Sequence, residues 1–256
     1  MSETPHLFRM FDRYDILARI TPGILAPLLP GASALIAFPE IITGSLYRAL
    51  GSGIVSIGLL YLFASLARSR GRALQETLKR QWGGLPTEIL LQHRDRTIEP
   101  PTKHAYHAAL QKLAPDFRLP TADEETRDPA AADEIYRAVV RRLIDLRRGP
   151  KYKLIHNDNI AYGFWRNLLG MKGLALILAV LSVAGIAAAQ LGHASIAMPD
   201  NKMAAIGLSI LWASFLLILV RPARVWDAGV CYAERLFASL TPPSARKARS
   251  KAEAAE

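Results

Sequence analysis

Three histidines near the middle of the chain are the first residues to consider for chemistry. His104 and His107 are three residues apart, so on a helix they share one face. With His93 nearby in sequence, their imidazoles could hold a metal ion. However, the chain has no HExxH pattern, and the neighbouring carboxylates lack the spacing of metal ligands. Exposed histidines are the preferred interpretation, and no metal or cofactor is predicted.

A cationic cluster is the stronger candidate for a binding site. Its five members are Arg94, Arg96, Lys103, His104 and His107. Such groups bind phosphates and carboxylates, and arginine does so with two parallel hydrogen bonds. The predicted ligand is an anionic, nucleotide-like molecule or a soluble cytoplasmic protein partner. The alternative is a solvated basic face that is attracted to anionic lipid.

Motifs of enzymes are absent from the sequence. There is no Walker A motif, no GxSxG and no paired-carboxylate pattern. The triplet His93-Arg94-Asp95 is similar to the start of a kinase catalytic loop, but no glycine-rich loop or DFG accompanies it. The single cysteine, Cys231, excludes an intramolecular disulfide and a cysteine-based zinc site. We therefore predict no catalytic residue and a protein that is not an enzyme.

Four apolar stretches determine where the segment with these candidate residues lies. They cover residues 20–38, 49–67, 173–191 and 203–220, and none contains a charged residue. A helix that crosses the hydrocarbon core of a bilayer needs about 20 such residues. Because 51% of the chain is hydrophobic and these residues are clustered, four transmembrane helices are favoured over four buried helices of a soluble protein.

The distribution of Lys and Arg predicts the orientation. Of the 32 basic residues, 30 lie before residue 20, between the second and third stretches, or after the fourth. The positive-inside rule therefore places both termini and residues 68–172 in the cytoplasm of a bacterium, in a multi-pass inner-membrane protein. This topology accounts for the net charge of +10, so nucleic-acid binding is not predicted. Asp12 and Asp15 precede the first stretch and disfavour a cleaved signal peptide.

The predicted fold class is an all-α membrane protein with a mostly helical cytoplasmic domain inserted between transmembrane helices 2 and 3. The five predicted parts are an interfacial segment (1–19), a helical hairpin (20–67), the basic domain (68–172), a second hairpin (173–220) and a basic tail (221–256).

Within the basic domain, the apolar periodicity and the residues that start or end helices predict the local structure. The second span continues as a helix through Arg80 and ends at Trp82 and Gly83-Gly84. Two further helices are predicted over 101–113 and 129–148, separated by a loop with an acidic stretch from Asp123 to Asp128. Residues 151–155 are predicted as a short strand. A helix beginning near Asn157 or Asp158 leads to the third span, with Trp165 and Arg166 at the membrane interface.

The first span is unusual because it contains Pro22, Gly23, Pro27 and Pro30. Internal prolines remove helical hydrogen bonds, and in lipid the freed carbonyls need partners within the protein. The kink is either a gate in a pore or a static feature of packing, and a re-entrant segment is a further alternative. No span contains an ionisable residue near its middle, which argues against proton-coupled transport.

Two stretches carry a resemblance to a known family. They are residues 14–19 (Tyr-Asp-Ile-Leu-Ala-Arg) with Pro22-Gly23, and residues 159–170 (Asn-Ile-Ala-Tyr-Gly-Phe-Trp-Arg-Asn-Leu-Leu-Gly). With Thr102-Lys103 and Tyr106-His107 between them, the chain resembles a family of uncharacterised bacterial four-helix inner-membrane proteins over residues 14–172. Such proteins occur among membrane effectors of antiphage defence. The resemblance implies no catalytic or ligand-binding residues.

The expected function is a membrane effector. A cytoplasmic domain would sense a partner or anionic ligand, and spans assembled as a homo-oligomer would perturb or permeabilise the bilayer. A membrane anchor that recruits a soluble partner is the alternative, and an accessory subunit of a transporter is a further one.

Overall fold

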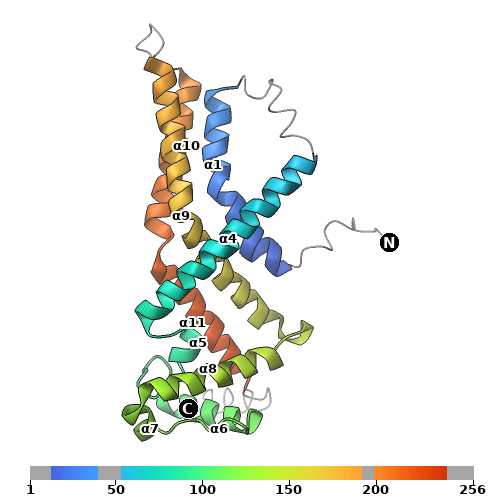
Figure 1. Ribbon diagram of the computed structural model, residues 1–256, viewed down its shortest axis with the longest axis vertical. Coiled ribbons are helices and arrows are strands. Elements are labelled where there is room, and N and C mark those ends of the chain that lie inside the picture. The colour runs from blue at the N-terminus through green and yellow to red at the C-terminus, as the bar shows by residue number, and fades with distance from the viewer. Residues whose placement is uncertain (1–12, 40–52, 192–198, 241–256) are drawn as a thin grey trace, which may run out of the picture. The chain divides into compact units, whose positions relative to one another are not determined.

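The computed structural model describes residues 13–39, 53–191 and 199–240, and every regular element in these ranges is a helix (Figure 1). The chain forms two compact units. Unit 1 comprises Met1–Thr77 and Ile160–Val225, and unit 2 comprises Leu78–Asn159 and Trp226–Glu256. Most of the predicted interfacial segment 1–19, the start of the second predicted span and the end of the predicted tail lie outside the described residues.

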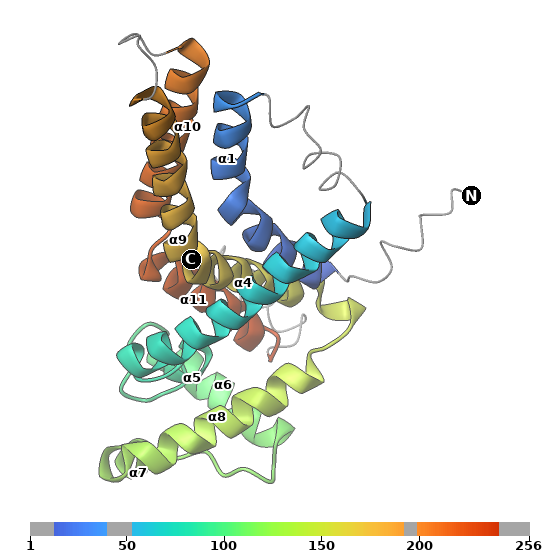
Figure 2. The same ribbon diagram turned by 45° about the horizontal axis from the view of Figure 1, so that its top comes forward.

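The described part of unit 1 is built mainly from five helical segments. They are the π-helical turn η2 (Asp15–Ile20), α1 (Thr21–Ala37), most of α4 (Gly53–Trp82), most of α9 (Lys153–Leu191) and α10 (Asp200–Leu219). In two views α9 and α10 run side by side with α1 next to them, while α4 crosses the start of α1 (Figures 1 and 2).

Three helices among the described residues are long and apolar enough to cross a membrane: Asp15–Ala37, Pro150–Leu191 and Asp200–Leu219. They coincide with the first, third and fourth predicted spans. Their outer surfaces are apolar, and on α10 the side chains of Ile210, Leu211, Leu217 and Ile218 are all more than half exposed. Apolar surface of this extent is a mark of contact with lipid or another protein.

The second predicted span is described only in part. Its residues 53–67 lie in α4, and residues 49–52 lie outside the described part of the chain. Because α4 is not among the three candidate spans, a membrane part with four spans stays a prediction.

Small residues set the packing of unit 1. Ala26, Ala67 and Ala175 are buried between the helices, together with the larger Trp212 and Leu216 of α10. Small side chains allow helix backbones to approach closely, which is the usual way in which helices associate in lipid.

Glycines permit backbone contact at two helix crossings. A Cβ atom on Gly23 of α1 would lie 2.6 Å from the carbonyl oxygen of Phe63 in α4. A Cβ atom on Gly170 of α9 would lie 2.8 Å from the backbone nitrogen of Gly71 in α4. Neither position has room for a larger residue unless the helices separate.

Unit 2 consists of shorter helices. They are the end of α4, α5 (Pro86–Ile89), α6 (Pro100–Leu113), α7 (Ala122–Arg127), α8 (Pro129–Leu146), the 3-10 turn η3 (Pro150–Tyr152), the start of α9 and most of α11 (Pro222–Ala238). Helix α4 ends at Trp82 as predicted, because Gly83 and Gly84 adopt positive φ angles of 79° and 157°.

One apolar core holds unit 2 together. Helices α6 and α8 supply Leu110, Val139 and Leu143, all 0–1% exposed. Tyr136 and Val140 of α8 are also buried in this core, whereas Leu146 at the end of the helix is 38% exposed.

Helix α11 completes this core with residues that the sequence analysis assigned to a tail. Its buried side chains are Tyr232, Ala233, Leu236 and Phe237. Residues 222–238 of the predicted tail therefore form a helix, and most of this helix packs in unit 2. An apolar face that recurs every three to four residues buries this helix in unit 2.

Two local predictions are wrong. Residues 151–155 form η3 and the start of α9 instead of a strand, and α9 continues unbroken from Lys153 to Leu191. The acidic stretch 123–128, predicted as loop, contains α7. This helix forms because Thr121 accepts a hydrogen bond from the N–H of Glu124 while the carboxylate of Glu124 accepts one from the N–H of Thr121.

The glycine crossing of α4 and α9 gives a direct test of the packing. We expect Gly170→Ala to lower the free energy of unfolding by on the order of 1–3 kcal/mol, because the new methyl group overlaps the backbone of Gly71. Gly173→Ala is the matched control on the same helix, since its added Cβ meets no atom within 4 Å. It should be neutral or stabilising by about 0.5–1 kcal/mol. The measurement is thermal unfolding of the full chain in detergent, and equal shifts for the two variants would contradict the close crossing.

Candidate functional site

The two stretches that carry the family resemblance meet inside unit 1. Pro22 has no N–H, so the carbonyl oxygen of Ala18, four residues earlier, loses its α-helical donor. The side-chain amide of Asn167, which is 0% exposed, donates to that oxygen at 2.5 Å. Residues 14–19 and 159–170 are therefore joined by a buried hydrogen bond, which we call the Asn167 junction.

Glycines make room for this junction on both of its sides. A Cβ atom on Gly163 would lie 3.0 Å from the side chains of both Ala18 and Tyr14. A Cβ atom on Gly71 would overlap the Oδ1 atom of Asn167. The amide of Asn167 thus fits only because α4 and α9 each present a glycine at this level.

Polar side chains surround the junction. Arg166 donates through Nη1 to the Oε1 atom of Gln75 at 2.6 Å, and through Nε and Nη2 to Asn167 Oδ1 at 3.1 Å each. The hydroxyl of Tyr162 also donates to Gln75, at 3.4 Å. Trp165 packs its ring edge-on against Phe164 and lies beside the apolar core of unit 1. Arg166, predicted as an interface residue, is thus part of a hydrogen-bond network between α4 and α9.

The predicted gate residues all lie in or at the start of α1. Pro22 is at its first turn, Pro27 and Pro30 are inside it, and the helix continues through them. Pro22, Gly23 and Pro30 are buried, and Gly23 contacts the backbone of Phe63. Such contacts are typical of static packing at Pro22 and Gly23, and gating by the prolines stays a prediction.

In unit 2, the predicted ligand residue Lys103 is engaged inside the protein. Its ammonium group is buried, donates to the carbonyl oxygens of Gln92 at 2.6 Å and Asp95 at 2.7 Å, and lies 3.6 Å from the Asp95 carboxylate. Burial lowers the pKa of Lys103 below its usual value, and the Asp95 charge opposes this shift. Lys103 therefore holds the loop after α5 in place.

The three histidines do gather at one place. The rings of His93 and His107 are 4.7 Å apart between centroids, and those of His93 and His104 are 6.4 Å apart. Because carbonyl oxygens only accept, Nε2 of His107 donates to Leu91 at 2.7 Å and Nε2 of His93 donates to Pro120 at 3.1 Å. Burial, the largest cause, lowers the pKa of His107 to about 4. No group of potential metal ligands occurs among the described residues.

Arg94 belongs to a network around a buried carboxylate. Its Nη2 atom donates to both oxygens of Asp133, at 2.8 and 2.9 Å. Glu125 is 3% exposed and accepts from the N–H groups of His93 at 2.8 Å and Arg94 at 3.1 Å, and from the Tyr136 hydroxyl at 2.7 Å. Burial alone would raise the pKa of Glu125, but these hydrogen bonds outweigh it and hold the pKa below its usual value. The pKa of Tyr136 is raised, first by burial and then by its bond to Glu125.

The five predicted ligand residues therefore fall into two groups. Arg94, Lys103 and His107 make internal hydrogen bonds, and of these three only Arg94 is also exposed, whereas Arg96 and His104 are exposed. Binding of an anionic ligand by this cluster stays a prediction, and only part of the cluster faces solvent.

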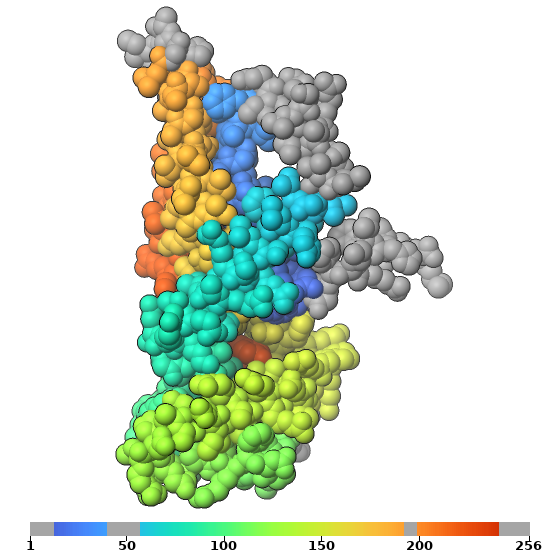
Figure 3. All heavy atoms as spheres, viewed as in Figure 1, coloured from blue at the N-terminus to red at the C-terminus, as the bar shows by residue number. Residues whose placement is uncertain are grey.

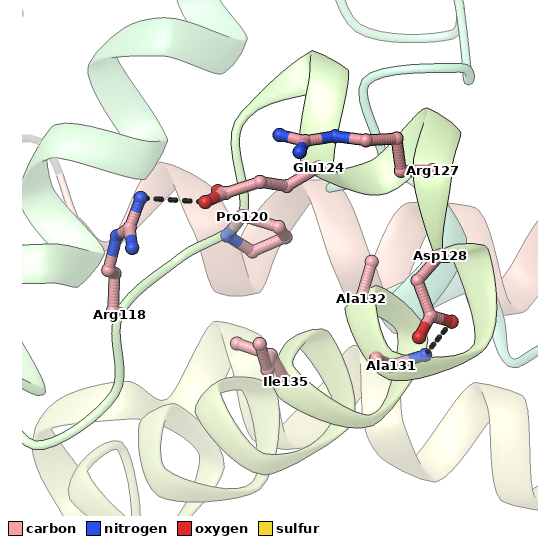
Figure 4. Close-up of a pocket in the computed structure, with 8 residues that line it drawn as sticks. All are labelled: Arg118, Pro120, Glu124, Arg127, Asp128, Ala131, Ala132 and Ile135. Carbon is pink, nitrogen blue, oxygen red and sulfur yellow. Dashed lines mark hydrogen bonds and ion pairs between the residues drawn. The ribbon is translucent and has the colours of Figure 1, made fainter.

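A hollow of about 400 Å³ in unit 2 is lined by other residues (Figure 4). Arg118 forms an ion pair with Glu124 at 2.7 Å on one side, and Arg127 lies on the other side of Glu124. Ala132 and Ile135 of α8 supply its apolar part. Pro120 also lines the hollow and connects it to the histidines through its hydrogen bond to His93.

Asn167, Glu125 and Tyr136 are functional candidates that only the structure reveals. The clue to Glu125 is the pattern Thr121-x-x-Glu124, which starts a helix and so gives the acidic stretch a defined inner face. An asparagine in an apolar stretch rich in glycine is the corresponding clue to Asn167, since a buried amide needs partners.

The chain matches no protein-family model, no curated protein and no solved structure.

The Asn167 junction predicts a specific coupling between two substitutions. Asn167→Ala should lower the free energy of unfolding by about 1–3 kcal/mol, because the buried Ala18 carbonyl loses its donor. In a Pro22→Ala background the new N–H at position 22 can donate to that carbonyl, so Asn167→Ala should cost less. A double-mutant cycle by thermal unfolding in detergent measures the difference. Asn159→Ala, at a half-buried position of the same helix, is the control, and strictly additive effects of Pro22→Ala and Asn167→Ala would refute the coupling.

The buried state of His107 predicts a dependence of stability on pH. The folded-state pKa of about 4 lies below the ordinary value of 6.5, so the unfolded chain binds the extra proton first as the pH falls. Stability should therefore be complete above pH 6.5 and decrease toward pH 4, by at most about 1.4 kcal/mol per pH unit. Thermal unfolding between pH 7.5 and pH 4.5 checks this. His107→Gln should flatten the profile and His156→Gln, at an exposed position, should not; an unchanged slope in His107→Gln would rule out this origin.

Proposed function

We propose that the chain is a non-enzymatic membrane effector, in which unit 2 binds a partner or anionic ligand and unit 1, as an oligomer, perturbs or permeabilises the membrane. The observation that carries the proposal is that α4 and α9, of 30 and 39 residues, each contain residues of both units. Rigid secondary elements can carry energetic coupling between distant sites, and a continuous helix shared by both units is such an element. Binding in unit 2 then reaches the membrane helices directly.

Membrane location is supported by the three apolar helices and their exposed outer faces. In the proposal, the apolar part of α4 completes a fourth span with the residues before it. Nearly all Lys and Arg then lie on the cytoplasmic side of a bacterial inner membrane, with both termini.

The Asn167 junction supports coupling between the membrane helices. It ties η2 to α9, and Gly71 and Gly170 bring α4 and α9 into backbone contact at the same level. A displacement of α4 or α9 therefore moves the start of α1, the helix with the prolines. The resemblance in sequence, and not the junction, is the reason to place such an effector in antiphage defence.

The proposed binding surface of unit 2 combines exposed cations with the hollow beside α7. Arg96 and His104 are exposed, and the Arg118 side chain at the rim of the hollow is 77% exposed. Arginines in such positions pair readily with carboxylates or phosphates of a partner.

A membrane anchor that recruits a soluble partner is the second candidate, and the hollow of unit 2 favours it. An anchor requires the binding surface and the membrane helices but no movement in the Asn167 junction. The two candidates therefore differ in the effect of substitutions in unit 1.

The effector proposal predicts a leak that depends on the junction. After induced expression in bacteria, with and without phage infection, membrane potential and propidium uptake should show depolarisation in cells that carry the full chain. Asn167→Ala should reduce the leak at an equal amount of protein in the membrane, and Gly173→Ala should leave it unchanged. An intact potential with the protein present in the membrane under both conditions contradicts the effector. Recruitment of a soluble partner that persists in Asn167→Ala would then favour the anchor.

A further inference from the structure

A second hollow, of about 220 Å³, lies within unit 1 between η2 and α4. It is lined by Asp15, Arg19 and Ile20 from η2 and by Tyr61, Ala64, Ser65 and Arg68 from α4. The space-filling view shows the dark blue residues of η2 directly against the cyan residues of α4 (Figure 3). None of these residues belongs to the Asn167 junction or to the binding surface of unit 2.

The lining has a regular geometry. On α4, residues 61, 64, 65 and 68 are spaced so that all four lie on one face of the helix. On η2, Asp15 forms an ion pair with Arg19, whose guanidinium also lies 5.1 Å from the centre of the Tyr14 ring. Arg19 is thus held in one orientation, and the hydroxyls of Tyr61 and Ser65 add hydrogen-bond donors to the lining.

The charges in the hollow are unbalanced by one. Asp15 compensates Arg19, whereas among the described residues no further acidic side chain lines the hollow opposite Arg68, which is exposed. A ligand with one negative charge would neutralise the site. A phosphodiester carries one negative charge and presents acceptor oxygens that arginine binds in pairs.

The position of the two arginines distinguishes a lipid from a soluble phosphate. Arg19 directly precedes the first apolar stretch and Arg68 directly follows the second, so both mark the level at which apolar helix surface ends. On the apolar side of this level, Ile57 and Leu62 of α4 are 56% and 57% exposed. A ligand that fits has an anionic phosphodiester beside the arginines and hydrocarbon beside these side chains.

We propose that the hollow between η2 and α4 binds the headgroup of an anionic phospholipid, with Arg68 and Arg19 on its phosphodiester. The inference rests on the membrane location in the proposed function, but it does not require a leak. It assigns unit 1 a lipid ligand that would hold η2 and α4 together at the membrane surface.

Binding can be measured on the full chain in detergent by native mass spectrometry. The protein is incubated with phosphatidylglycerol or with phosphatidylcholine of the same acyl chains, and the fraction with bound lipid is recorded. Phosphatidylglycerol should remain bound at lower lipid concentration, because the choline of phosphatidylcholine cancels the charge that matches the site. Inorganic phosphate, added in competition, should not displace it at equal concentration.

Substitutions locate the site. Arg68→Ala should weaken retention of phosphatidylglycerol about tenfold, as expected when one charged hydrogen-bonding group is removed. Arg68→Lys keeps the charge but loses the paired geometry, so its effect should be intermediate. Arg70→Ala is the matched control, since Arg70 is also exposed on α4 and does not line the hollow. Because Arg68 is exposed, its loss should leave thermal unfolding of the lipid-free protein unchanged.

Three results would overturn the proposal. Equal retention of the two lipids, or equal losses in Arg68→Ala and Arg70→Ala, would indicate general attraction to basic helices. Displacement by inorganic phosphate at equal concentration would identify a soluble anion as the ligand. The leak experiment is independent of this binding measurement, so failure of the effector function and failure of the lipid site are distinguishable.

Discussion

The bond from the Asn167 amide to the Ala18 carbonyl is the interaction on which the packing of unit 1 depends. Pro22 starts a helix but removes the α-helical donor of the buried Ala18 carbonyl. A buried carbonyl without a donor costs about 1–3 kcal/mol. Asn167 meets this need from a different helix, and its own oxygen accepts from Arg166. The bond thus joins the entry of α1 to α9.

The glycines around the junction follow from the same constraint. A side chain as short as asparagine reaches the Ala18 carbonyl only if the helices approach closely, and Gly71, Gly163 and Gly170 provide that approach. Where helices are held by backbone contact and one buried amide, few alternative packings are available. This favours a static kink at Pro22. Any gating movement would be confined to Pro27 and Pro30 or would carry η2, α4 and α9 together.

Unit 2 shows a different solution to buried polarity. Glu125 is held ionised by the backbone N–H groups of His93 and Arg94, and the buried amine of Lys103 donates to the carbonyls of Gln92 and Asp95. Both charged groups act on the same stretch after α5, so together they fix a segment that has no regular structure of its own. This explains why cations that look available for a ligand in the sequence are partly engaged within the protein.

The helices were largely predictable from the sequence, and the contacts among them were not. Apolar runs, prolines at first turns and Gly83-Gly84 correctly indicated α1, α6, α8, α10 and the end of α4. The differences have local causes: a capping pair at Thr121 and Glu124 makes α7, and the apolar period after Pro222 makes α11 part of a core.

The candidate site was predictable only as two stretches of interest. The two stretches are joined by a hydrogen bond between residues 149 positions apart. A contact between residues so far apart leaves no periodic pattern in a single sequence. What the sequence does contain is a proline that frees a carbonyl, and an asparagine in a glycine-containing, largely apolar part of a helix. A carbonyl without a donor and a buried amide without a partner are each costly, and pairing them removes both costs, so their presence in one chain indicates contact.

Pro27 and Pro30 would likewise release the carbonyls of Gly23 and Ala26 inside unit 1. The indole N–H of Trp212, which is buried without a hydrogen-bond acceptor among the described residues, packs in the same core as Ala26. A carbonyl that a proline leaves without its α-helical donor and an indole N–H without an acceptor among the described residues thus belong to one apolar core, where an unpaired polar group is costly.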